Sequence, residues 1–160
     1  MSTESNKANK EKTREVVINS CYGGFGLSHE AMMEYAKLKG IELYGYINAR
    51  TRNRIQNNGT PELSRYELYD PKHDKNEICV HYYSTKLLKT CSNKELNDNY
   101  FHPDLIRDDP DLVKVVRKLG KKANERCADL KIVEIPYDVE WVIEEYDGIE
   151  WVAEKHQTWS

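Results

Sequence analysis

The alternation of hydrophobic and polar positions along the chain marks out one early strand and two helices. Three consecutive β-branched residues at 16–18 predict a short strand that is buried on both faces. Residues 28–39 repeat apolar side chains at helical spacing behind Ser28, which is typical of a helix N-cap. A second helical pattern follows Asp109 and Pro110, and it predicts a helix over 110–119, with an extension to 127 left open.

The last thirty residues have the clearest strand pattern. A strand is predicted over 131–135, closed by Pro136. Two further alternating runs, 139–146 and 149–156, flank Asp147 and Gly148. An Asp-Gly pair between such runs favours a two-residue type I′ turn, because both turn residues need positive φ. The sequence therefore predicts a C-terminal β-hairpin.

Between these regions the pattern is weaker. Short strands are predicted over 41–47, 64–70 and 78–83, and residues 84–106 are ambiguous, with room for one short helix. The predicted fold class is α+β: a mixed β-sheet of about five to six strands with two main helices and the C-terminal hairpin. Residues 1–13 read as a disordered tail, and 14–160 as a single α+β domain with a polar insert loop near 48–64.

Composition narrows the class of protein. The chain has 160 residues, which is enough for one core, and a formal net charge of −3 that gives no case for a general nucleic-acid binder. The sequence shows no signal peptide and no apolar run long enough to cross a bilayer. We therefore expect a soluble intracellular protein with reduced cysteines, and the oligomeric state stays open.

The most distinctive motif is the glycine-rich segment between the first strand and the first helix. Glycines permit close approach to the backbone, and a helix N-terminus offers unpaired N–H groups to an anion. The segment is neither a Walker A motif nor a clean G-x-G-x-x-G motif, so a tight strand-to-helix connection is the alternative. The predicted ligand-binding residues are Gly23, Gly24, Phe25, Gly26 and Ser28. Arg107, or the strip formed by Arg50, Arg52 and Arg54, is expected to balance the charge of the ligand.

Catalytic and metal sites have weaker support. Cys21 follows the first strand, but Leu27 stands where a tyrosine-phosphatase loop needs arginine, so a structural cysteine is favoured. The five histidines do not cluster in the sequence, and Cys79, His81 and Cys91 lack convincing zinc spacing. We predict no catalytic residue, no metal and no cofactor.

Two charged surfaces are also predicted. Arg50, Arg52 and Arg54 alternate in the insert, and a row of lysines and arginines follows the outer face of the second helix. The hairpin is acidic, and its predicted register places Glu145 opposite Glu150, which is unfavourable. Pairing of the hairpin with the basic helix is the simplest account. A bound cation, a basic partner or a different hairpin register is the alternative.

Three segments, VVINSCYGGFGLS, RDDPDLVKVV and LKIVEIPYDVEWVIEEYDGIEWVAEKHQTW, resemble an uncharacterised family of small conserved proteins from phages and large DNA viruses. The resemblance covers the first strand–helix unit and most of 107–159, and excludes the insert at about 48–75. It implies a viral protein that acts in the host cell cytoplasm. It supplies no activity and no catalytic residues.

Three functions follow from these observations. The first is binding of a phosphate-containing or nucleotide ligand at the glycine-rich turn. The second, ranked almost level, is a protein–protein interaction module that modulates a host factor through the acidic hairpin. The third, an enzyme using Cys21 or an acid at the turn, ranks last.

Overall fold

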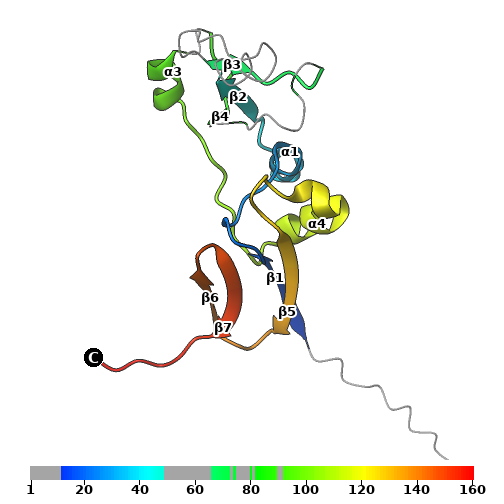
Figure 1. Cartoon of the computed structure of the whole chain (residues 1–160), viewed down its shortest axis with the longest axis vertical. Helices are drawn as coiled ribbons and strands as arrows, with labels where there is room; N and C mark the ends of the chain where they lie inside the picture. The colour runs from blue at the N-terminus through cyan, green and yellow to red at the C-terminus, as the bar shows by residue number, and fades with distance from the viewer. Residues whose placement is uncertain (1–11, 49–65, 73, 75–79, 81, 90–91) are drawn as a thin grey trace, which may run out of the picture.

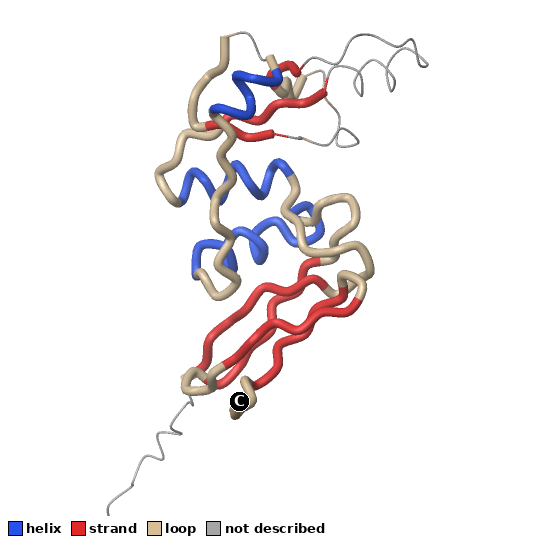
Figure 2. The backbone as a smooth tube through the Cα atoms, turned by 90° about the vertical axis from the view of Figure 1, so that its left-hand side faces the viewer, coloured by secondary structure: helices blue, strands red, loops and turns tan. Residues whose placement is uncertain are grey.

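The computed structural model describes residues 12–48, 66–72, 74, 80, 82–89 and 92–160. These residues form an elongated molecule with three tiers (Figures 1 and 2). A small sheet with one short helix lies at one end, two longer helices occupy the middle, and four strands lie at the other end. The glycine-rich segment runs between the lower and middle tiers.

The lower tier contains two antiparallel strand pairs. Strand β1 (Thr13–Asn19) pairs with β5 (Leu130–Pro136), which follows much later in the sequence. Strands β6 (Trp141–Tyr146) and β7 (Ile149–Glu154) form the C-terminal hairpin, and β7 also contacts β1. Asp147 and Gly148 have φ values of 49° and 89°, as a type I′ turn requires.

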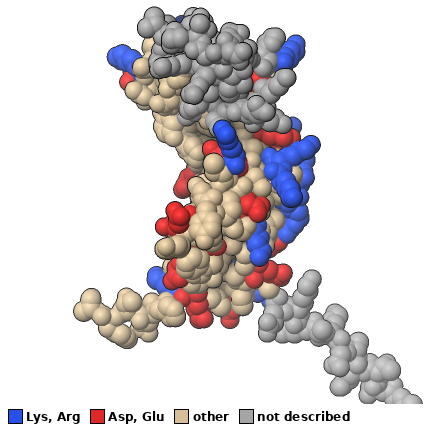
Figure 3. Space-filling model, in the orientation of Figure 1, with Lys and Arg blue, Asp and Glu red and all other residues tan. Residues whose placement is uncertain are grey.

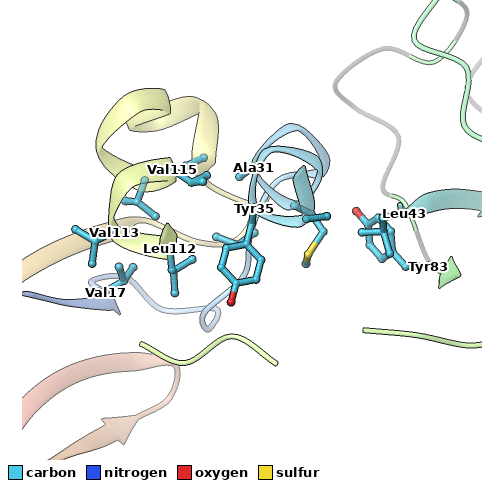
Figure 4. Packing of buried hydrophobic residues seen from close by; sticks show 13 residues of the cluster. Val17, Ala31, Tyr35, Leu43, Tyr83, Leu112, Val113 and Val115 are labelled. Atoms are coloured by element: carbon cyan, nitrogen blue, oxygen red, sulfur yellow. The ribbon is translucent and has the colours of Figure 1, made fainter. Parts of the chain in front are cut away.

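The middle tier holds the main core. Helix α1 (His29–Leu38) begins at Ser28, whose side chain accepts a hydrogen bond from the Ala31 N–H. Helix α4 (Pro110–Leu119) begins at Asp109 and continues into a 3-10 turn, η1 (Gly120–Ala123). Apolar side chains of both helices pack together and against β1 (Figure 4). The residues shown there include Val17, Ala31, Tyr35, Leu112, Val113 and Val115.

The upper tier is smaller. Strand β2 (Tyr44–Asn48) is the centre of a three-stranded antiparallel sheet, with β3 (Tyr66–Leu68) on one side and β4 (Tyr82–Ser84) on the other. Helix α3 (Asn93–Asp98) packs against this sheet through Leu96, which joins a second core cluster around the buried Tyr46.

The α+β class is confirmed, and the arrangement of the sheet is corrected. Among the described residues, seven strands form three separate small sheets with three α-helices, and all named strand pairs are antiparallel. The prediction of one mixed sheet of about five to six strands was wrong in strand number and arrangement: helices α1 and α4 separate the upper sheet from the lower strands, and β1–β5 and β6–β7 form two separate antiparallel pairs. Most of the predicted tail and of the insert, including Arg50, Arg52 and Arg54, lies outside the described residues.

Candidate ligand-binding site

The first half of the glycine-rich segment packs against the hairpin turn. Gly23 and Gly24 have φ values of 133° and 104°, which side chains rarely adopt. An added Cβ on Gly148 would lie 2.6 Å from the Gly23 nitrogen and 2.5 Å from the Gly24 nitrogen. The amide nitrogens of these two predicted ligand-binding residues therefore face the protein's own turn.

Asn19 ties this contact together. Its carboxamide nitrogen donates to the carbonyl oxygens of Cys21 and Gly148, each at 2.7 Å. Its carboxamide oxygen accepts from the Asp129 N–H at 2.8 Å. Cys21 is only partly buried, and its thiol contacts the side-chain oxygen of Asn19 and the carbonyl of Cys127, each at 3.4 Å. The segment thus has a structural role where it leaves β1.

The second half of the segment is joined to the chain that follows α4. The Ser28 N–H donates to the carbonyl of Ala123 at 2.8 Å, and the Ser28 hydroxyl donates to the carbonyl of Lys122 at 2.6 Å. The Glu125 N–H donates to the carbonyl of Gly26 at 3.2 Å. These bonds place residues 121–126 beside the start of α1.

Arg107 does not reach out of the protein toward a ligand. Its guanidinium bonds both carboxylate oxygens of Glu150, at 2.8 and 2.9 Å, and the carbonyl of Val17 at 3.2 Å. The guanidinium also lies 3.4 Å from the centre of the Phe25 ring, as a cation–π contact. Glu150 neutralises Arg107, and the hairpin is thereby fixed to the core.

A cavity of about 1440 Å³ lies in front of Phe25, Gly26 and Ser28. Its walls come from the start of α1, from β2 and β4, from the loop around His102 and from residues 121–126. Three of the six predicted ligand-binding residues line it, whereas Gly23, Gly24 and Arg107 do not. The structure therefore divides the predicted site into a structural half and a half that borders open space.

Four aromatic side chains from separate segments meet on one wall of this cavity. The His29 ring lies 4.3 Å from the Tyr69 ring and 5.8 Å from the Tyr83 ring, measured between centroids. His102 meets Tyr83 edge-on at 6.5 Å. The Nδ1 atom of His29 forms a hydrogen bond with the Tyr83 hydroxyl at 3.0 Å.

The absence of a side chain at Gly45 makes room for His29. An added Cβ at this buried position would lie 2.8 Å from the Cε1 atom of the His29 ring. The same residue holds Tyr69 in place, because the Tyr69 N–H donates to the Gly45 carbonyl at 2.9 Å. The imidazole therefore packs closely against β2 at Gly45.

Burial sets the protonation of this pair. Loss of solvent lowers the pKa of His29 to about 4, so its imidazole is neutral at pH 7. Burial, followed by the nearby charge of Glu125, raises the pKa of Tyr83 above its usual value. Both groups are thus uncharged hydrogen-bonding groups rather than ions.

Charged side chains on the other walls are mostly basic. Lys121, Lys122 and Arg126 are exposed and line the cavity, together with the carboxylates Glu30 and Glu125. They continue the row of cations over α4 that Figure 3 shows on the molecular surface. In that row, Arg117 pairs with Glu15 and Lys118 pairs with Glu34. In the described part of the chain, the ion pairs of α4 thus run to β1 and α1, and the expected pairing with the acidic hairpin is absent.

The contacts among the rings of His29, Tyr69, Tyr83 and His102 were not predicted from the sequence. These residues are far apart in the chain, and no local spacing signals that they touch. Cys79, His81 and Cys91, weighed as zinc ligands, lie outside the described residues. Within the described part of the chain, no group of three or more His, Cys, Asp or Glu side chains is arranged to hold a metal ion.

Comparison of the chain with protein-family models, with curated proteins and with solved structures gave no match. In the described ranges, no helix has the length and apolar character needed to span a bilayer.

The half-buried, neutral His29 predicts a loss of stability in mild acid. In the unfolded chain a histidine takes up a proton below about pH 6.5, whereas in the fold it does so only near pH 4. The contribution of the neutral imidazole is therefore complete above pH 6.5 and is lost as the pH falls toward 4. Since His29 is partly exposed, we expect about 1–3 kcal/mol.

Urea unfolding at pH 7.5 and pH 4.5 measures this loss. A His29→Gln variant, which cannot take up the proton, should show a smaller difference between the two pH values. A His156→Gln variant is the matched control, because His156 is exposed, and it should retain the wild-type difference. Equal pH dependence in the wild type and the His29→Gln variant would contradict the burial argument.

Proposed function

We propose that this chain binds a phosphate-containing small molecule in the cavity beside the glycine-rich strand–helix segment. The observation that supports it is a large concave space bordered by Phe25, Gly26 and Ser28 and by three exposed cations, Lys121, Lys122 and Arg126. Ligand pockets commonly enclose about 300–1,000 Å³, so the space accommodates a ligand well beyond the size of one phosphate.

The charges favour an anion at the end near residues 121–126. The three cations outnumber the two carboxylates that line the same cavity, Glu30 and Glu125. The Ser28 hydroxyl already donates a hydrogen bond to the Lys122 carbonyl and accepts one from the Ala31 N–H. We therefore assign the phosphate to the lysine and arginine side chains and not to the helix cap. This moves the site from the amides of Gly23 and Gly24 to the opposite end of the segment.

Charge reversal tests the proposal. The Lys121→Glu/Lys122→Glu double variant should bind pyrophosphate, ATP or ADP at least tenfold more weakly than the wild type, because hydrogen bonds to charged groups are worth about 1.5–3 kcal/mol each. Isothermal titration with the full chain measures the affinity. A ligand at one hundred times its Kd should also raise the stability of the wild type by about 2.7 kcal/mol.

The control is Lys114→Glu, which reverses an exposed charge on the same helical stretch but outside this cavity. Its affinity should stay within about twofold of the wild type, since surface changes away from the site have small effects. Equal weakening by the control would mean that net charge, and not the cavity, decides binding. No binding of any phosphate compound by the wild type would refute the proposal.

The second candidate is an interaction surface on the hairpin. Glu144, Glu145, Asp147 and Glu154 are exposed there, next to the exposed Tyr146 and Trp151. Acidic side chains around exposed aromatic rings fit a basic partner protein. Glu150 is no part of this surface, because it is occupied by Arg107.

A further inference from the structure

We infer that the ligand of the cavity carries a nitrogenous aromatic base, and that His29, Tyr69 and Tyr83 form the subsite for that base. This inference rests on the proposed function and narrows its ligand to a nucleotide, as opposed to a phosphorylated sugar or an inorganic polyphosphate. The geometry of the aromatic wall supports it, in three steps.

The first step is the unused hydrogen-bonding capacity of the histidine–tyrosine pair. A neutral imidazole has one donor and one acceptor, and a phenol hydroxyl has one donor and acceptor lone pairs. The bond between His29 Nδ1 and the Tyr83 hydroxyl uses one donor and one acceptor, whichever way the proton lies. Among the described residues no other hydrogen bond to either side chain is present, so one donor and at least one acceptor remain for a ligand.

The second step is the chemical match between this capacity and possible ligand groups. A phosphate offers acceptors only and favours a cation, whereas His29 is neutral. The edge of a nucleobase presents donors and acceptors side by side. Glu125, which is close enough to affect Tyr83, adds a further acceptor for an amino group. The pair is therefore suited to a base and poorly suited to a phosphate.

The third step is the aromatic wall and the basic residues that line the same cavity. His29, Tyr69, Tyr83 and His102 all contribute rings to this wall, and aromatic rings are the usual stacking partners of bases. Lys121, Lys122 and Arg126 belong to the same cavity, on the segment that follows α4. A molecule with a base at one end and phosphate at the other offers a matching group to each of the two sets of residues that line this cavity.

The test compares ligands that contain the base, the sugar and the phosphate with ligands that lack one or two of these parts. AMP, GMP, CMP, UMP, the four nucleosides, ribose 5-phosphate and pyrophosphate are titrated against the full chain. At least one nucleoside monophosphate should bind ten times or more as tightly as ribose 5-phosphate. Tyr83→Phe and His29→Phe should each weaken that nucleotide about tenfold and leave ribose 5-phosphate unchanged.

Tyr82→Phe is the matched control, because it removes a neighbouring hydroxyl on β4 from a residue outside the cavity. If His29→Phe fails to fold, His29→Gln replaces it and should also weaken the nucleotide, because the donor and acceptor of glutamine lie at a different position from those of the imidazole. Circular dichroism confirms that each variant is folded before titration. The nucleotide affinity of the Tyr82→Phe variant should equal that of the wild type.

The outcomes separate this inference from the proposed function. If ribose 5-phosphate binds as tightly as every nucleotide, and Lys121→Glu/Lys122→Glu still weakens binding at least tenfold, the base subsite is wrong and the phosphate site stands. If nucleosides alone bind, and Tyr83→Phe weakens them, the base subsite stands and the phosphate site is wrong. If the nucleotide affinity is the same in the wild type, in His29→Phe and in Tyr83→Phe, the inference is wrong. It is also wrong if no compound binds.

Discussion

Replacing Gly148 with alanine is expected to destabilise the fold by about 2–5 kcal/mol. Two costs add in this variant. The residue has a φ of 89°, where a side chain is strained, and the new Cβ would lie 2.5 and 2.6 Å from the backbone nitrogens of Gly24 and Gly23. Neither nitrogen belongs to a movable side chain. The hairpin turn must therefore withdraw from the glycine-rich segment.

The matched control for Gly148→Ala is Gly40→Ala. Gly40 has a φ of 67°, but an added Cβ there meets nothing within 4 Å, so this variant measures strain without a collision. We expect it to cost about 1–2 kcal/mol. In a thermal melt, each kcal/mol corresponds to about 2–4 °C for a chain of this size. Equal melting temperatures for the two variants would show that the hairpin does not press on Gly23 and Gly24.

The elements that could be predicted from sequence are those whose signals are local. Ser28 and Asp109 begin the two main helices as expected, because each cap bonds to an N–H two or three residues ahead. The predicted hairpin register, which places Glu145 opposite Glu150, is confirmed, since Asp147 and Gly148 dictate the turn. Pairing of β1 with β5 could not be predicted, because nothing local specifies a partner so distant in the chain.

The candidate site was predictable only in part for the same reason. A glycine-rich strand–helix segment indicates backbone that something approaches closely, and at Gly23 and Gly24 that partner is Gly148. The sequence gives no means of distinguishing such an internal contact from an external ligand. The His29–Tyr83 bond joins an α1 residue to a β4 residue, so no motif encodes it. The unfavourable facing of Glu145 and Glu150 was a usable signal, and Arg107 is its explanation.

The second large effect is expected from Glu150→Gln. Glu150 and Arg107 are mostly buried, with 9% and 21% of their side chains exposed, and the variant leaves the guanidinium without a countercharge. Removing one partner of a buried pair is costly, and for this slightly exposed pair we expect about 2–4 kcal/mol in urea unfolding. Glu154→Gln, on the same strand but exposed, should change stability by less than about 0.5 kcal/mol.

A double variant shows that the loss comes from the pair itself. Arg107→Met/Glu150→Gln removes both charges, so its destabilisation should be clearly smaller than the sum of the two single changes. Additive losses would mean that the two side chains act independently. The carbonyl of Val17 and the ring of Phe25, which contact Arg107 in the wild type, are unchanged in each variant.

The single variant Glu150→Gln also decides whether Arg107 is a structural residue or a ligand-binding residue. If Arg107 were a ligand-binding residue held in reserve by Glu150, Glu150→Gln would release its charge and tighten the binding of phosphate compounds. The geometry predicts otherwise, because the guanidinium lies over Phe25 and against Val17, and it is not part of the cavity lining. We therefore expect no gain in nucleotide or pyrophosphate affinity in folded Glu150→Gln protein. If the variant bound these phosphate compounds tenfold or more tightly than the wild type, Arg107 would be a ligand-binding residue. Glu150 of the hairpin would then inhibit binding by pairing with Arg107.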